Sequence, residues 1–258
     1  MKKKFFKNFY ITIIFIFLFF PIAVLFLYSF NDSSMNIIFE GFTLRWYKEL
    51  FQNIELIEAF KNTMMIALIS TLISTIIGTL GAVGFRKYDV KGEKLITKLL
   101  YIPIVIPEIV LGISLLSIYT LFKLKLSLVT ILISHVVFSI PYVMVSVKSS
   151  LNEYGDVVEK AAYDLGASNF QTFFKITLPA IMPGVRSGAL LAFTLSLDDV
   201  IISYFTAGPG SNTLPLKIYS MIKTGVTPDV YALTSLMLIF VLFILTVNMM
   251  INVRKLRG

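Results

Sequence analysis

Three carboxylic acids stand within stretches of sequence that are otherwise apolar: Glu108 and the adjacent pair Asp198 and Asp199. A charged side chain at the centre of a membrane helix costs about 2.5–3.5 kcal/mol on insertion scales, and such residues usually line a pathway. Fixed carboxylates can replace part of the hydration that a cation loses, so the first hypothesis is a path for a cationic solute. The alternative is that the acids are hydrogen-bonded packing elements.

The two aspartates cannot both face the same path, because adjacent residues on a helix point about 100° apart. The helical face of Asp199 also carries Ser196, Ser203 and Thr206. One acid could face the solute while a neighbouring helix holds the other. The helical periodicity does not show whether Asp198 or Asp199 faces the solute.

The depth of each acid follows from the helical rise of about 1.5 Å per residue. Glu108 is expected near the membrane midplane, about 13–14 Å into a span that enters from the inside. Asp198 is expected in the outer half, about 21 Å past Gly184. Pro103 and Pro107 should kink the span that carries Glu108, because proline removes a backbone donor.

Other kinds of chemistry have little support in the sequence. The chain has no cysteine, which excludes disulfides and thiolate chemistry. His135, the single histidine, lies inside an apolar stretch, and we expect it to be packed or hydrogen-bonded there. The phosphate-binding pattern G-x-x-x-x-G-K-[ST] is absent, so the chain is not expected to bind ATP itself. We expect a non-enzymatic protein with no catalytic residue, cofactor or metal of its own.

The composition predicts an all-α integral membrane protein. Hydrophobic residues make up 57% of the 258-residue chain and charged residues 15%, against roughly 45–50% and about 25% in soluble domains. A membrane helix needs about 20 apolar residues, and lipid offers the backbone no hydrogen-bond partners. Six apolar stretches meet this length: 9–30, 63–85, 99–122, 126–147, 184–207 and 231–253. Together they predict one transmembrane domain over residues 1–258.

The positions of the basic residues predict the topology. Of the 23 lysines and arginines, 16 lie on one set of alternating connections and termini and seven on the other. Basic residues concentrate on the cytoplasmic side, so both termini and residues 148–183 are expected inside, and residues 31–62 and 208–228 outside. The net charge of +8 is then a topology signal, not evidence for nucleic-acid binding.

The outer connection 31–62 holds the one tryptophan, Trp46. Its ring could stack on a cation or anchor the chain at the lipid interface. Apolar residues recur at helical spacing from Leu44 to Phe60, which predicts a helix along the membrane surface.

The inner connection 148–183 predicts two short helices. Val157, Val158, Ala161, Ala162 and Leu165 recur at helical spacing. Gly166 then follows, where a helix end needs a left-handed residue. Ser168 and Gln171 form a capping box that opens a second, phenylalanine-rich helix, which Leu178-Pro179 should end. Such a hairpin could dock onto another protein or could simply cover the base of the helix bundle.

The spacing within this hairpin resembles the cytoplasmic coupling motif of ABC importer permeases. That motif has E-A-A, three residues, glycine, nine residues and I-x-L-P, and it is matched by Ala161, Ala162, Gly166, Ile176, Leu178 and Pro179. The sequence departs from it at the acid, where Lys160 stands and Glu159 comes one place earlier. Either Glu159 substitutes by a small rotation, or that contact with the ATPase is missing.

Residues 107–116 and 187–233 resemble the permeases of spermidine/putrescine importers in particular. The resemblance implies a type I ABC importer permease fold in the bacterial inner membrane. It also implies a second, related permease subunit, two ATPase subunits that bind ATP-Mg, and an external or periplasmic substrate-binding protein. The residues expected along the substrate path are Glu108, Asp198, Asp199, Trp46 and Ser203. Those expected at the ATPase contact are Glu159, Ala161, Ala162, Gly166, Ile176, Leu178 and Pro179.

Three other functions remain open at this point. An ABC importer for another small solute is the nearest alternative, although the acids argue against an anion. An intramembrane enzyme would use the carboxylates without an evident metal cluster or histidine partner. An ion channel would leave the structured inner hairpin unexplained.

Overall fold

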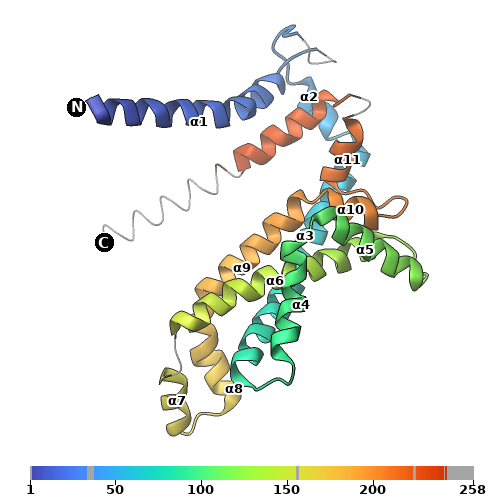
Figure 1. Ribbon diagram of the computed structural model, residues 1–258. Helices are drawn as coiled ribbons and strands as arrows, with labels where there is room; N and C mark the ends of the chain where they lie inside the picture. Colours follow the sequence, from blue (N-terminus) through green and yellow to red (C-terminus); the bar gives the residue numbers. More distant parts are fainter. Residues whose placement is uncertain (1, 34–37, 155–156, 223–224, 241, 243–258) are drawn as a thin grey trace. The chain divides into compact units, whose positions relative to one another are not determined.

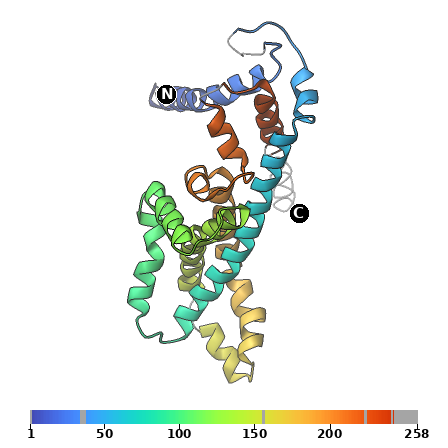
Figure 2. The same ribbon diagram turned by 90° about the vertical axis from the view of Figure 1, so that its right-hand side faces the viewer.

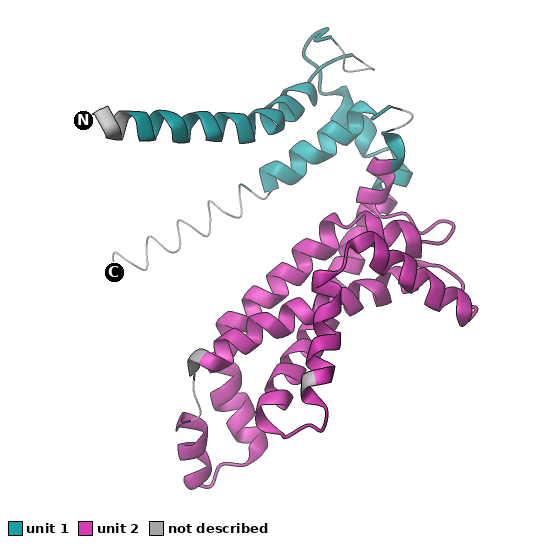
Figure 3. Ribbon diagram, in the orientation of Figure 1, with its two compact units in different colours: residues 1–57, 220–258 teal, residues 58–219 magenta. Residues whose placement is uncertain are grey.

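The computed structural model describes residues 2–33, 38–154, 157–222, 225–240 and 242, and this part of the chain is helical almost throughout (Figure 1). The chain divides into two compact units, residues 1–57 with 220–258 and residues 58–219 (Figure 3). The expected all-α class is confirmed. Four helices are long and apolar enough to cross a membrane, and a fifth span is counted if one bent helix pair is included.

The first unit contains α1 (Lys2–Tyr28), α2 (Arg45–Leu50) and a shorter apolar helix, Pro228–Phe240. Asn31 organises the turn between the first two helices: its side chain donates to the Ile38 carbonyl at 2.8 Å and accepts from the Glu40 amide at 2.8 Å. The sixth expected span, 231–253, lies largely outside the described residues. The single helix expected over Leu44–Phe60 is wrong, because α2 ends at Leu50 and a second helix starts at Ile54.

The second unit is formed by the remaining helices, beginning within α3, which is a single long helix (Figure 2). Their bounds are α3 Ile54–Lys87, α4 Glu93–Val105, α5 Glu108–Leu121, α6 Leu128–Tyr154, α7 Val157–Asp164, α8 Asn169–Thr172, the π-helix η1 Phe173–Thr177, α9 Leu178–Asp198, α10 Ile201–Thr206 and α11 Leu214–Met221. Residues of α3 before Glu58 and of α11 after Tyr219 belong to the first unit.

The third apolar stretch is broken rather than kinked. Ile106 and Pro107 are both extended, with ψ angles of 148° and 138°, and the axes of α4 and α5 differ by 114°. A residue before proline avoids the helical region, which explains the break at Ile106. Pro103 lies inside α4. By length and composition the two helices form one broken span or a re-entrant loop, so the expected bend is present but larger than a kink, and Glu108 becomes the first residue of a new helix.

The fifth apolar stretch begins earlier than expected and ends at the aspartates. Leu178-Pro179 does not end the preceding helix: α8, η1 and α9 follow one another without interruption from Asn169 to Asp198. Proline removes one i→i−4 hydrogen bond, and the π-helical segment, which bonds i→i+5, directly precedes it. At the other end Asp199 is extended, with φ −63° and ψ 125°, and separates α9 from α10.

Helices α6 and α9 pack closely along glycines, as the four-residue spacing of Gly184 and Gly188 predicts. A Cβ atom at Gly184 would lie 2.7 Å from the Ser146 carbonyl oxygen, and one at Gly188 would lie 3.0 Å from the Cα of Val143. Buried apolar side chains flank this contact. They are Ala82, Val143, Met144, Val147, Leu151, Ile181 and Ala192.

Candidate functional site

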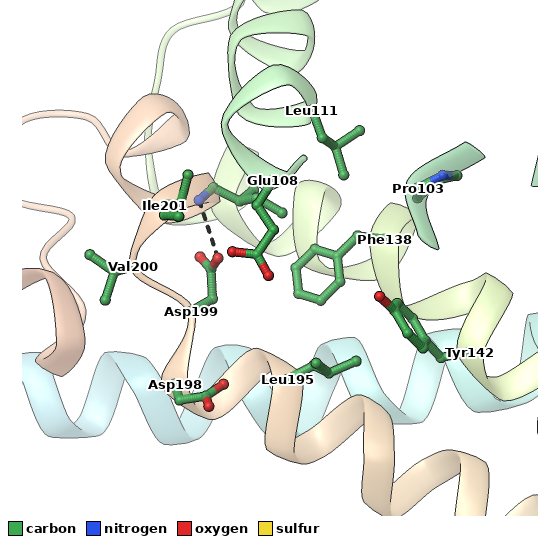
Figure 4. A pocket seen from close by; sticks show the side chains of 11 residues that line it. Pro103, Glu108, Leu111, Phe138, Tyr142, Leu195, Asp198, Asp199, Val200 and Ile201 are labelled. Atoms are coloured by element: carbon green, nitrogen blue, oxygen red, sulfur yellow. Dashed lines mark hydrogen bonds between the residues drawn. The ribbon is translucent and has the colours of Figure 1, made fainter. Parts of the chain in front are cut away.

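The three acids of the apolar stretches meet at one pocket in the second unit (Figure 4). Its volume is about 280 Å³. Glu108 reaches it from the start of α5, Asp198 from the end of α9, and Asp199 from the break that follows. The depths expected for Glu108 and Asp198 assumed straight helices, and the helices on which the two acids lie are not straight there; the membrane depth of each acid stays a prediction. The bend before α5 and the break after α9 instead bring both acids to the same cavity.

The two aspartates differ in burial and in their contacts. Asp199 is buried: its Oδ1 accepts from the Ile202 amide at 3.1 Å and its Oδ2 from the Ser203 amide at 2.7 Å. Asp198 is exposed, as is Glu108. Within the described part of the chain, neither of these two carboxylates has a hydrogen-bond donor or a basic partner. Asp198 and Glu108 are therefore the acids available to a solute, and Asp199 is held by the protein.

Two aromatic side chains of the pocket were missed in the sequence. Phe138 and Tyr142 lie four residues apart on α6 and line the same cavity as the acids (Figure 4). Aromatic faces attract cations, and the rings also offer apolar surface to methylene groups. Phenylalanine and tyrosine are so frequent in this chain, with 23 and 12 copies, that composition singles out neither residue. The four-residue spacing on one face of α6 was the only available signal.

His135 lies behind the pocket wall and is hydrogen-bonded, as expected. Its Nδ1 lies 2.6 Å from the Ser196 hydroxyl, and its Nε2 lies 3.1 Å from the Ser203 hydroxyl and 3.3 Å from Oδ2 of Asp199. Ser203 is fully buried and does not line the pocket. Its hydroxyl supports the imidazole and its amide supports Asp199.

Trp46 belongs to the other unit, where its indole N–H donates to the Asn31 carbonyl. Only 5% of the residue is exposed, and the guanidinium of Arg45 lies 4.1 Å from the ring centroid. The indole thus anchors the turn between α1 and α2, and its polar atom is already used there. A role for Trp46 in substrate contact stays a prediction.

The inner hairpin has the local structure that its sequence predicts. Gly166 adopts a φ of 84°, and Ser168 and Gln171 form a complete capping box. The Thr177 hydroxyl donates to Oε1 of Glu159 at 2.7 Å and so joins η1 to α7. Large apolar side chains of the hairpin remain exposed. They are Val157, Val158, Leu165, Phe170 and Phe174.

The end of α3 clamps this hairpin. The ammonium group of Lys87 donates to the Tyr163 hydroxyl at 2.7 Å and to the Asn169 side-chain oxygen at 2.8 Å, so it holds both helices of the hairpin. Glu159 is engaged by Thr177, while Lys160 is exposed. The side chain at the usual acid position is therefore an exposed cation, and the neighbouring carboxylate already has a partner inside the hairpin.

The sequence and fold were compared with those of known proteins. The model of the family described as "Binding-protein-dependent transport system inner membrane component" matches residues 70–256. The chain is 39% identical to the spermidine/putrescine transport system permease protein PotC of Escherichia coli K12, covering 96% of this chain and 94% of that protein. It is 38% identical to the putrescine permease protein PotI of the same organism, covering 87% and 82%.

Among solved structures, the fold is similar to a chain of a bacterial ABC transporter involved in the import of alginate, an acidic polysaccharide. The TM-score is 0.70 at 14% sequence identity, and the match covers 96% of this chain and 95% of that one. At this identity the likeness shows a common fold, that of an ABC importer permease.

Proposed function

Because the chain belongs to the family of binding-protein-dependent transport system inner membrane components, it is a permease subunit of an ABC importer, and we propose that its cargo is a polyamine such as spermidine or putrescine. The family is one of transport subunits, whose ATP hydrolysis takes place in separate chains. The observation that carries the proposal is the pocket in which Glu108 and Asp198 have no partner among the residues that the structure describes, and in which Phe138 and Tyr142 form part of the wall.

The chemistry of the pocket suits a linear polycation. A polyamine alternates ammonium groups with short methylene chains, and each ammonium that leaves water needs hydrogen-bond acceptors or a negative charge. Glu108 and Asp198 supply carboxylates, which make strong charge-assisted hydrogen bonds. The apolar and aromatic walls can pack against the methylene groups. An anion would find no counter-charge among the lining residues.

The partners follow from the family and from the exposed surfaces. We propose that an ATPase subunit docks on the apolar side chains of the inner hairpin, whose turn depends on Gly166. Burial of exposed valine, leucine and phenylalanine side chains would drive this contact. A second, related permease subunit, two ATPase subunits carrying ATP-Mg and a substrate-binding protein would complete the importer. This chain would contribute no cofactor.

We further propose that the chain forms one permease domain with six spans and both termini in the cytoplasm of a bacterium. The proposal rests on the apolar stretch 231–253 and on the asymmetry of basic residues. The hairpin of α7 and α8 would then lie on the cytoplasmic side.

The topology can be tested with single cysteines, because the chain has none of its own. Ser168→Cys in the hairpin should resist a membrane-impermeant thiol reagent in intact cells and react after the membrane is opened. Gln52→Cys, exposed in the outer connection, is the matched control and should react in intact cells. Reaction at position 168 in intact cells would reverse the proposed orientation.

The cargo can be tested in membrane vesicles that contain the complete importer, supplied with binding protein and ATP. Labelled spermidine or putrescine should accumulate in the vesicles only when ATP is supplied on the side of the membrane that carries the ATPase subunits. Unlabelled polyamine should compete with the label, and a monoamine of equal carbon length should compete at least tenfold less well. Absence of saturable polyamine uptake by an assembled, ATP-hydrolysing complex would refute the cargo assignment.

A further inference from the structure

A buried imidazole joins the helices that surround the break after α9. His135 of α6 is 1% exposed and contacts Ser196 of α9, Ser203 of α10 and Asp199 between them. Ser70 of α3 donates to the Ser196 hydroxyl at 3.1 Å, so a fourth element joins the same network. One side chain thus fixes α6 to both sides of the break.

The break depends on the carboxylate of Asp199. Two backbone amides at the start of α10 donate to it, at 3.1 and 2.7 Å. Asp199 also lines the pocket, but its carboxylate is already engaged by these two amides. The imidazole Nε2 of His135 lies 3.3 Å from Oδ2 of the same carboxylate, so a third group, from α6, also contacts it.

We infer that His135 is a positioning residue for the cargo: by holding Asp199 and its two neighbouring serines, it keeps the helix broken so that Asp198 faces the pocket. The inference rests on the proposed function, since it assigns the cargo to Asp198 and Glu108. If His135 could no longer bridge these groups, the carboxylate of Asp199, which already lines the pocket, would lose its link to α6, and residues 199 and 200 could join α9 and α10 into one helix. The side chains beyond the break would then rotate.

The geometry of the break can be measured without any cargo. Ile202 is 2% exposed, so Ile202→Cys should be protected from a small thiol reagent in the purified complex. His135→Leu keeps an apolar side chain at the site but has no hydrogen-bonding group, and it should raise the labelling rate at position 202 at least tenfold. His135→Gln can still reach Ser196 and Asp199 with its amide, and it should leave the rate within about threefold of the parent.

His135→Asn tests whether the length of the side chain matters as well as its hydrogen-bonding group. It carries the same amide as glutamine on a side chain one methylene shorter, so it should behave like the leucine variant. If the leucine variant does not fold, the comparison of asparagine with glutamine still decides. Equal protection of Ile202→Cys in the asparagine and glutamine variants would overturn the inference.

Uptake provides the second readout. With cysteine-free protein at equal amounts of assembled complex, His135→Leu and His135→Asn should lower maximal polyamine uptake at least tenfold, and His135→Gln should lower it less than threefold. Adding Asp199→Asn to His135→Asn should cause no further tenfold loss, because both changes act on the same contact. Additive losses would show that His135 acts independently of Asp199. If the complex moves no polyamine, the cargo assignment is refuted. The role of His135 in holding the break is still tested in that case, because the labelling of position 202 needs no cargo.

Discussion

Replacing Glu108 by glutamine or Asp198 by asparagine should lower polyamine uptake roughly ten- to a hundredfold, with no loss of assembled complex. A hydrogen bond to a charged group contributes about 1.5–3 kcal/mol, and each 1.36 kcal/mol changes a rate tenfold. Both carboxylates are exposed to the pocket, so neutralising them breaks no contact that the structure shows. The measurement is initial uptake of labelled spermidine and putrescine in vesicles, divided by the amount of complex.

Asp89→Asn is the matched control, because it makes the same isosteric change at an exposed acid between α3 and α4. It should leave uptake unchanged. If the acids were packing elements instead, uptake by the pocket variants would fall in step with their abundance. Normal uptake by both pocket variants would end the carboxylate mechanism and reopen the choice of substrate.

Gly184→Val should prevent accumulation of assembled complex. A Cβ atom at this position would lie 2.7 Å from the Ser146 carbonyl oxygen and closer still to the Ser150 side chain, so α6 and α9 would have to separate. Overpacking of a core typically costs about 1–3 kcal/mol, and here the obstacle includes backbone that has no other rotamer. We expect at least a tenfold drop in the yield of monodisperse complex on size-exclusion chromatography.

Gly84→Val provides the comparison for this variant. Gly84 also lies in a long apolar helix, but a Cβ atom there would meet nothing within 4 Å. The two variants share the same change in volume and in helix propensity. A yield of Gly184→Val equal to that of Gly84→Val would show that the glycine contact between α6 and α9 is not needed for assembly.

The features predicted correctly from the sequence are those set by neighbouring residues. Gly166 takes the left-handed conformation, and Ser168 caps the next helix, because both depend on a few adjacent backbone groups. The acids of the apolar stretches were singled out for a similar reason, since a charge in an apolar span is costly wherever the helices lie; their part in transport stays a prediction.

The features that could not be predicted depend on distant residues. Pro107 breaks its span by 114° while Pro179 lies in a continuous helix, and local sequence offers no rule to separate the two cases. To decide which of Asp198 and Asp199 is held by the protein, the side chain that contacts Asp199 had to be known. That partner, His135, lies 64 positions earlier in the chain and could be found only from the packing of α6 against α9 and α10.

The uninterrupted helix from Asn169 to Asp198 also has a mechanical consequence. It has 30 residues, which at about 1.5 Å per residue corresponds to about 45 Å measured along the helix, with the inner hairpin at one end and a pocket acid at the other. Gly184, where α6 comes closest, lies 15 residues from the first end and 14 from the second. A displacement of the hairpin would therefore be passed along continuous helical backbone, past the glycine contact with α6, to the residue that precedes the break. The π-helical segment Phe173–Thr177 and Pro183 are the points along this path at which the helix can bend.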